Sequence, residues 1–316
     1  MVLFLKISVH LEITLSYSAD VFNIILIIFK AVKDTYLLEN NSIKCKGNLI
    51  DLSTPKIMSI INTTPDSFYD GGKNNSLKNV LNKIEHDLKS NAEIFDVGGY
   101  SSKPNAKFVS ENEEINRTIN IIEQIIKRFP NINISIDTFR GSVAEKAINA
   151  GAGIVNDISA FSLDDKMLDV LERYKPTYIL MHMKGTPQTM QLKPMYENIL
   201  TEISSFFIEK ISILEKIKLN NIIIDPGFGF GKTISHNYRL MSNLEVFKQL
   251  NKPLLIGISR KSMINKVLKI KPLDALNGTT ALNMYALCSG ANILRVHDVK
   301  QANECIKIYK EIQNNK

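Results

Sequence analysis

Residues 133–159 read NISIDTFRGSVAEKAINAGAGIVNDIS, and this stretch carries the pattern that decides the fold. Two short runs rich in β-branched residues, Asn133–Thr138 and Ile154–Ser159, flank a segment with helical spacing, Ser142–Ala150. Each run is almost continuously apolar, which is typical of a strand buried on both faces of a parallel sheet. The stretch therefore predicts one strand–helix–strand unit.

The same alternation recurs from residue 57 to the end of the chain. Six more runs of this kind are predicted as strands: Ile57–Asn62, Glu93–Gly98, Thr177–Met183, Asn221–Gly227, Pro253–Ser259 and Asn292–Asp298. The intervening segments are predicted as helices: Leu77–Ser90, Val109–Phe129, Asp164–Tyr174, Tyr196–Leu219, His236–Leu250, Asp274–Ser289 and Val299–Gln313. Eight alternating units without an early GxGxxG turn predict an α/β fold, a single (β/α)8 TIM barrel with parallel strands and an active site at the C-terminal face.

Composition limits the classes of partner. The 316 residues fit one barrel of about 250 residues with an extension. The net charge of +7 has no accompanying basic stripe or arginine-rich arm, so it favours a solvated surface and small anionic substrates over nucleic acid. Three widely spaced cysteines, Cys45, Cys288 and Cys305, fit neither a disulfide framework nor a zinc site and indicate a cytoplasmic protein.

Residues 1–42 form a predicted N-terminal extension of unknown role, separate from a barrel domain of residues 43–316. Its apolar run, Val21–Phe29, is shorter than the roughly 20 residues of a membrane span. Glu12 and Asp20 interrupt the segment, so it does not resemble a signal peptide. We expect no membrane association, and a start codon assigned too far upstream is one explanation of the segment.

Polar residues stand at the end of nearly every predicted strand. They are Asn62, Asp96, Asp137, Asn156 with Asp157, His182, Asp225, Ser259 before Arg260 and Lys261, Arg295 and His297. One such residue is usually a helix cap or a turn former. Because the ends of barrel strands meet at one mouth, the whole set predicts a shared ligand site.

A glycine-rich stretch, Asp225–Lys232, follows the sixth predicted strand. It is not a phosphate-binding P-loop, because three residues separate Gly227 from Gly231 where that motif has four before Gly-Lys. The glycines are expected to let the backbone turn tightly above the barrel.

From about residue 43, the chain resembles dihydropteroate synthases. The segments that carry this resemblance lie in family order: INTTPDSFYDGG (61–72), DVGGYSSKP (96–104), SIDT (135–138), IVNDIS (154–159), MHMKGTP (181–187), DPGFGFGK (225–232), SRKS (259–262) and RVHD (295–298). The resemblance implies condensation of a dihydropterin diphosphate with 4-aminobenzoate to give dihydropteroate in folate biosynthesis. It also implies a sulfonamide target that forms a homodimer through outer helices.

The resemblance assigns roles to these residues. The catalytic residues are Asp137, Lys261, Arg295 and His297. The pterin-binding residues are Asp137, Asn156, Asp225 and Lys261, with Met181 and Phe230 as apolar walls. The diphosphate is assigned to Asn62, Ser102, Lys103, Arg295, Val296 and His297, with Asn62 also binding Mg²⁺. The aminobenzoate is assigned to Ser102, Pro104, Phe230 and Ser262.

The second loop departs from the family pattern. Tyr100 stands where relatives have an acidic or small residue, Ser102 where they have Thr, Lys103 where they have Arg and Asn105 where they have Gly. Lys103 keeps the charge but loses the bidentate fork. Ser59 replaces a usual Gly. These differences bear on the aminobenzoate and diphosphate contacts, and on sulfonamide sensitivity, more than on the reaction.

Two other functions remain open from the sequence. A methyltetrahydrofolate:corrinoid methyltransferase shares the floor of Asp137, Asn156 and Asp225, but is not expected to combine the Thr64–Gly72 loop with Lys261 and the Arg295–His297 pair. A non-catalytic pterin-binding barrel is suggested by the altered second loop.

Overall fold

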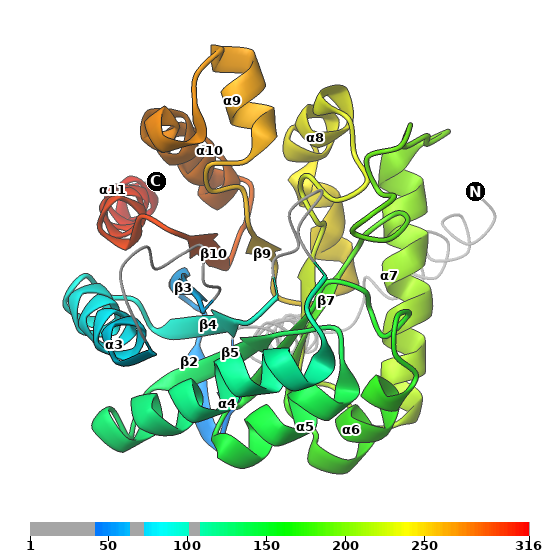
Figure 1. Cartoon of the computed structure of the whole chain (residues 1–316). Helices are drawn as coiled ribbons and strands as arrows, with labels where there is room; N and C mark the ends of the chain where they lie inside the picture. The colour runs from blue at the N-terminus through cyan, green and yellow to red at the C-terminus, as the bar shows by residue number, and fades with distance from the viewer. Residues whose placement is uncertain (1–41, 64–72, 101–107, 316) are drawn as a thin grey trace, which may run out of the picture. The chain divides into compact units, whose positions relative to one another are not determined.

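The computed structural model describes residues 42–63, 73–100 and 108–315. Eight parallel strands follow one another around a ring in chain order, and the last pairs with the first. They are β3 (Lys56–Asn62), β4 (Ile94–Gly98), β5 (Asn133–Asp137), β6 (Ile154–Asp157), β7 (Thr177–Met181), β8 (Ile222–Asp225), β9 (Leu255–Ile256) and β10 (Ile293–Val296). A bridge between Ile224 and Leu254 closes the ring between β8 and β9. The predicted (β/α)8 barrel is confirmed (Figure 1).

Helices surround the strands on the outside of the barrel (Figure 1). They are α3 (Lys73–Lys89), α4 (Glu111–Arg128), α5 (Gly141–Ala150), α6 (Lys166–Tyr174), α7 (Ile199–Lys216), α8 (Ile234–Met241), α9 (Ser262–Leu268), α10 (Leu276–Cys288) and α11 (Val299–Asn314), with the 3₁₀ segments η2 (Leu244–Leu250) and η3 (Pro272–Asp274). The single helix predicted over His236–Leu250 was wrong. The Asn243 side chain donates to the Arg239 carbonyl at 2.8 Å, which competes with the helical hydrogen bonds and separates α8 from η2. Helix α9 was not predicted.

An antiparallel hairpin, β1 (Ser42–Cys45) and β2 (Asn48–Asp51), precedes the barrel and was not predicted. Its turn residues, Lys46 and Gly47, both have positive φ, as a two-residue hairpin turn of the primed type requires. Hairpin side chains pack against the apolar residues at the N-terminal ends of the barrel strands. This cluster consists of Ile43, Cys45, Ile50, Leu52, Met58, Ile94, Ile154, Ile179, Ile223, Leu255 and Ile293. The hairpin therefore covers the barrel end opposite the predicted site.

Alternation along each strand divides the barrel into a helix-facing and an interior set. Ile57, Phe95, Val155 and Leu180, for example, pack into the core under the helices. Their neighbours in sequence point inward, since successive strand residues face opposite sides. Inside the barrel the layer nearest the hairpin is apolar. The next inward positions toward the C-terminal ends include Asp96, Asn156, Asp225 and Arg295.

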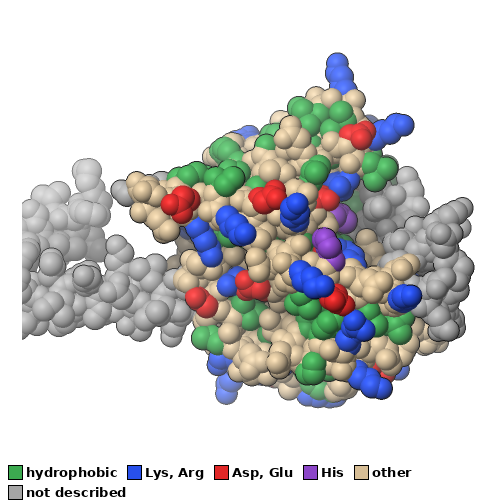
Figure 2. Space-filling model, turned by 90° about the vertical axis from the view of Figure 1, so that its left-hand side faces the viewer, with side chains coloured by type: hydrophobic (Ala, Val, Ile, Leu, Met, Phe, Trp, Pro, Cys, Tyr) green, Lys and Arg blue, Asp and Glu red, His purple; other side chains and the backbone are tan. Residues whose placement is uncertain are grey.

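Among the described residues, no helix is long and apolar enough to cross a membrane. Lysine and arginine side chains are interspersed with acidic and hydrophobic ones on the face shown in Figure 2. Residues 1–41 lie outside the described residues, so the predicted extension stays a prediction. Ser42, assigned to the extension, is the first residue of β1.

Candidate active site

Arg295 joins three strands at the C-terminal end of the barrel. Its Nε atom donates to Asp96 Oδ2 at 2.6 Å, and its Nη2 atom donates to Asp137 Oδ2 at 2.7 Å. Asn156 Nδ2 also donates to Asp96 Oδ2, at 2.9 Å. Burial opposes the charge of the guanidinium, but the Asp96 and Asp137 carboxylates outweigh it and raise the pKa of Arg295. Strands β4, β5, β6 and β10 thus share one polar floor.

Asp137 has an unusual environment for a carboxyl group. Burial raises its pKa to about 7, while Arg295 opposes this rise and Asp96 adds to it. Such a group changes charge near neutral pH. The other floor carboxylate, Asp96, is almost fully buried, and its Oδ1 atom has no hydrogen-bond partner among the described residues. This leaves a buried acceptor for a ligand N–H group.

A second pair consists of Asp225, the last residue of β8, and Lys261, which precedes α9 as its N-cap residue. Asp225 Oδ1 accepts from the Gly227 N–H at 2.8 Å. Burial raises the pKa of Asp225, and the Lys261 charge opposes the rise. Burial also lowers the pKa of Lys261 to about 8, opposed by Asp225. Lys261 Nζ donates to the Phe228 carbonyl and lies 4.7 Å from the centroid of the Phe230 ring.

The rim of the mouth holds Ser259, His297 and Asn62. Ser259 Oγ lies 3.0 Å from His297 Nδ1 and accepts from the His297 N–H at 3.2 Å. Desolvation and the nearby Arg295 charge lower the pKa of His297, although the residue is exposed. Asn62 is exposed at the end of β3. Ser262 is exposed at the first position of α9, after Lys261.

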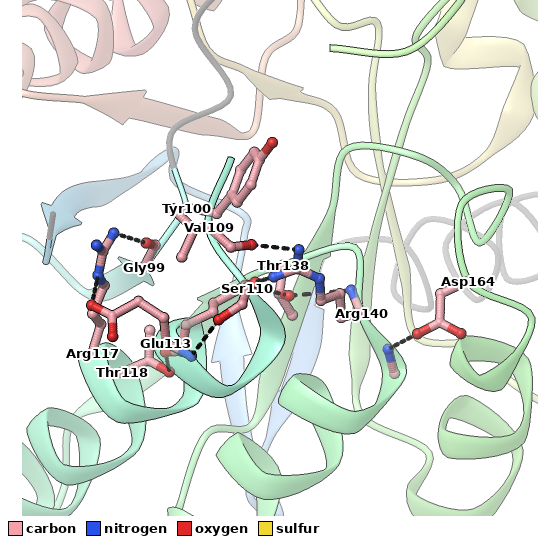
Figure 3. A network of polar contacts seen from close by, with 12 residues as sticks. Gly99, Tyr100, Val109, Ser110, Glu113, Arg117, Thr118, Thr138, Arg140 and Asp164 are labelled. Carbon is pink, nitrogen blue, oxygen red and sulfur yellow. Dashed lines mark hydrogen bonds and ion pairs between the residues drawn. The ribbon is translucent and has the colours of Figure 1, made fainter. Parts of the chain in front are cut away.

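A buried network supports the end of β5 from outside the barrel (Figure 3). Thr138, next to Asp137, donates from Oγ1 to Glu114 Oε1 at 2.7 Å, and Arg140 Nη1 pairs with Glu114 Oε2. Arg140 Nη2 donates to the Val109 carbonyl at 2.7 Å. Burial raises the pKa of Glu114, and Thr138 and Arg140 oppose the rise. The network ties α4 to the strand that carries Asp137.

Two strand-end residues were wrongly expected at the shared mouth. Asp157 is fully buried, and its oxygens accept from the N–H groups of Ser159 and Phe161 and from the hydroxyls of Ser159 and Tyr178. His182 lies edge-on to Phe206 of α7, with ring centroids 4.9 Å apart. Both follow an inward residue, so alternation turns them toward the helices. Asp157 thus shapes a turn.

The remaining predicted residues have these positions. Met181 and Val296 are buried. The Val296 side chain packs in the core under the helices. Phe230 is half-buried beside Lys261. Ser102, Lys103 and Pro104, like residues 64–72, lie outside the described residues. The sequence placed Asp96 at a strand end but gave it no role. Its position along β4 points its side chain into the barrel, as for Asn156 and Asp225, and this alternation could have indicated a role.

Comparison with known proteins gives the family. The family model "Pterin binding enzyme" matches residues 58–297. The dihydropteroate synthase of Escherichia coli is 42% identical over 265 residues, covering 83% of this chain and 93% of that protein. That of Bacillus subtilis is 39% identical over 260 residues, covering 82% of this chain and 88% of the other.

Solved structures agree. A Yersinia pestis dihydropteroate synthase, solved as a sulfonamide drug complex, aligns with a TM-score of 0.82 and 37% identity, covering 86% of this chain and 99% of that chain. The 7,8-dihydropteroate synthase of Vibrio fischeri aligns with a TM-score of 0.77 and 38% identity, covering 86% and 98%. The chain belongs to the family of pterin-binding enzymes and, within it, to the dihydropteroate synthases.

Proposed function

We propose that this protein condenses (7,8-dihydropterin-6-yl)methyl diphosphate with 4-aminobenzoate, giving 7,8-dihydropteroate and diphosphate. It is an enzyme of folate biosynthesis that transfers an alkyl group other than methyl. The observation that carries the proposal is the hydrogen-bonded polar floor of Asp96, Asp137, Asn156 and Arg295 beside the Asp225–Lys261 pair.

The floor suits the donor and acceptor pattern of a pterin edge. Asp225 accepts from the ring N–H and amino groups, and Lys261 donates to a ring acceptor. Asn156 offers both a donor and an acceptor. The unpaired Asp96 Oδ1 supplies one more acceptor. Met181 and Phe230 form apolar walls for the flat ring.

In the reaction, the C–O bond between the exocyclic methylene and the diphosphate breaks, and its electron pair leaves with the diphosphate. Positive charge spreads into the pterin ring, where the ionised Asp137 stabilises it. The neutral arylamine then forms the new C–N bond and releases a proton to solvent.

Arg295 and His297 bind the leaving group in this proposal. The Arg295 bonds to Asp96 and Asp137 use Nε and Nη2, so the Nη1 donors have no hydrogen-bond partner among the described residues. Arginine forks match phosphate geometry well. Ser102 and Lys103 are proposed to extend these contacts, and Ser102, Pro104, Phe230 and Ser262 to hold the aminobenzoate, on family resemblance.

Asn62 would hold Mg²⁺ by its amide oxygen. No cluster of three or more His, Cys, Asp or Glu that could hold a metal exists among the described residues, so a metal here depends on substrate oxygens and water. An exposed amide at the mouth fits that mode, because Mg²⁺ commonly takes few protein ligands. When bound, the ion neutralises charge on the diphosphate.

One assay tests the function. The purified chain is supplied with both substrates, and diphosphate and dihydropteroate are measured together. Equal amounts of both products are expected. Tight dihydropterin binding without diphosphate release would instead identify a non-catalytic binding protein, and methyl transfer from methyltetrahydrofolate to a corrinoid would identify the methyltransferase.

The protein is further proposed to act in the cytoplasm as a homodimer. Exposed apolar side chains lie on the outer segments around α9, η3 and α10: Val267, Leu268, Leu273 and Tyr285. Light scattering of the purified chain tests the dimer. A monomer at micromolar concentration would contradict it.

A further inference from the structure

Lys232 is a buried ionisable side chain that the reaction does not use. It ends the glycine-rich loop after β8 and is almost fully buried. Burial holds the pKa of Lys232 well below its usual range, although Asp225 opposes this. A buried lysine is costly unless its N–H groups are bound, so its partners identify what it does.

Four acceptors surround the Lys232 Nζ atom. Two are carbonyls of its own loop, Gly227 and Phe230, each at 2.9 Å. The others belong to His182 at the end of β7: ring atom Nδ1 at 3.0 Å and the carbonyl oxygen at 3.3 Å. An ammonium donates to the three nearest of them. A neutral amine donates to the two loop carbonyls and accepts from His182 Nδ1–H. Both protonation patterns therefore hold the loop.

The other hydrogen bonds of the loop come mainly from the segment after β7, where Gln191 donates to the Gly229 carbonyl at 2.6 Å and Tyr196 to the Gly231 carbonyl at 2.8 Å. Gly227 and Gly231 have φ of +69° and +61°, and a Cβ on Gly227 would lie 2.0 Å from the His182 carbonyl oxygen. The loop backbone at Gly227 therefore lies in close contact with the end of β7 at His182. Among the described residues, no strand hydrogen bonds hold the loop in this left-handed conformation. Lys232 cross-links both sides of this contact, and Asn237 Oδ1 accepts from the Gly229 N–H at 2.7 Å.

The opposite side of the same loop faces the site. The Gly227 N–H donates to Asp225, the Phe228 carbonyl accepts from Lys261, and the Phe230 ring lies against Lys261. Lys232 thus binds the carbonyls of residues 227 and 230, while residues 227, 228 and 230 set the positions of Asp225 and Lys261. Gly227 thus connects Lys232 to Asp225, and Phe230 connects Lys232 to Lys261.

We propose that Lys232 is a positioning residue for the pterin-binding pair Asp225 and Lys261, acting through the Gly227 and Phe230 carbonyls and His182. The proposal deepens the proposed function, because it rests on the pterin-binding role of that pair. It predicts that loss of Lys232 weakens pterin binding selectively and leaves the diphosphate side of the site intact.

The test compares Lys232→Met with the matched control Lys216→Met, which removes an exposed lysine at the end of α7. Calorimetry measures binding of (7,8-dihydropterin-6-yl)methanol, which lacks the diphosphate, and separately of inorganic diphosphate. For Lys232→Met we expect at least tenfold weaker pterin binding, with diphosphate binding changed less than twofold. Hydrogen exchange should accelerate in residues 226–231 and not in β5 or β6. Lys216→Met should match the wild type.

The outcomes separate the two proposals. If the wild type fails to bind the pterin alcohol, the proposed function fails. If the wild type binds it and Lys232→Met binds it equally, only the positioning role is overturned. A merely structural role would lower the unfolding temperature but not the pterin affinity of the folded protein. Should Lys232→Met not fold, Lys232→Gln is used instead, because its amide has two N–H donors on a shorter side chain and cannot bind all three nearest acceptors. Pterin affinity equal to wild type in that variant would then overturn the proposal.

Discussion

Arg295 Nη2 donates to Asp137 Oδ2 at 2.7 Å, although 158 residues separate the two in sequence. Because Asp96 shares the same guanidinium, one cation faces one fully buried and one partly buried carboxylate. The positive charge of Arg295 therefore does not fully offset the negative charges of both carboxylates. Asp96 raises the pKa of Asp137, and Arg295 lowers it. This arrangement suits a site where positive charge develops next to Asp137 during the reaction.

Replacing Asp137 by Asn should lower kcat by about 100-fold or more, since an electrostatic contact to the developing charge is lost. Steady-state release of diphosphate measures this. Asp165→Asn is the control, because Asp165 is exposed and its side chain makes no capping hydrogen bond. Full turnover in Asp137→Asn would show that Asp137 has no role in the chemistry.

The acidic limb of the pH profile should report the same group. The pKa of Asp137 is raised to about 7, so the carboxyl gains a proton as the pH falls through that value. The ionised form stabilises the transition state, and kcat should therefore fall below about pH 7. An unchanged acidic limb in Asp137→Asn would contradict this reading.

Lys261 should set the alkaline limit of pterin binding. Its pKa is lowered to about 8, so its positive charge is present below that value and is lost as the pH rises through it. Affinity for the dihydropterin should decline above about pH 8. Lys261→Ala should bind at least tenfold more weakly at neutral pH, and its affinity should not decline further near pH 8. Calorimetry at several pH values distinguishes these curves.

Ser59→Ala should destabilise the barrel without affecting turnover. Ser59 is fully buried on the helix-facing side of β3, and its hydroxyl donates to the buried Asp87 at 2.6 Å. Loss of a donor to a buried carboxylate costs about 1–3 kcal/mol of unfolding free energy.

Ser53→Ala provides the matched comparison. The Ser53 hydroxyl donates to Asp51 at 2.7 Å, but this bond is exposed, so the expected cost is well below 1 kcal/mol. Urea unfolding of both variants gives the difference. Equal losses of stability in the two variants would mean that burial of Asp87 is not the cause.

Gly227→Ala should abolish pterin binding, whereas Gly47→Ala should not. Both glycines have positive φ, but a Cβ at Gly227 would meet the His182 carbonyl, and at Gly47 nothing lies within 4 Å. Gly47→Ala should therefore cost only the backbone strain, roughly 1 kcal/mol. Binding and thermal unfolding of the two variants check this, and normal pterin binding by Gly227→Ala would contradict the loop geometry.

Much of the fold followed from the sequence because its pattern is local. Runs such as Asn133–Thr138 and Ile154–Ser159 are apolar on both faces, and only strands covered inside and outside have that pattern. The hairpin β1–β2 was not predicted, because each of its strands has only four residues and packs against the barrel on one face only. Such strands lack the continuous apolar run of the barrel strands. The sequence also predicted a site at Asp137, Asn156 and Asp225, because these polar residues stand at the ends of predicted strands.

The sequence by itself determined that a polar site closes the C-terminal end of an eight-stranded barrel. Tertiary structure decided which of these polar residues contact one another in that site. Asn156 and Asp157 are neighbours in the chain, yet the first enters the mouth and the second supports a turn under the helices. The odd or even position of a residue along its strand decides whether its side chain points into the barrel or toward the helices. Its hydrogen-bond partner, however, lies on another strand. The Arg295 contacts and the Lys232 cross-link arise only when barrel closure brings distant strands and loops together.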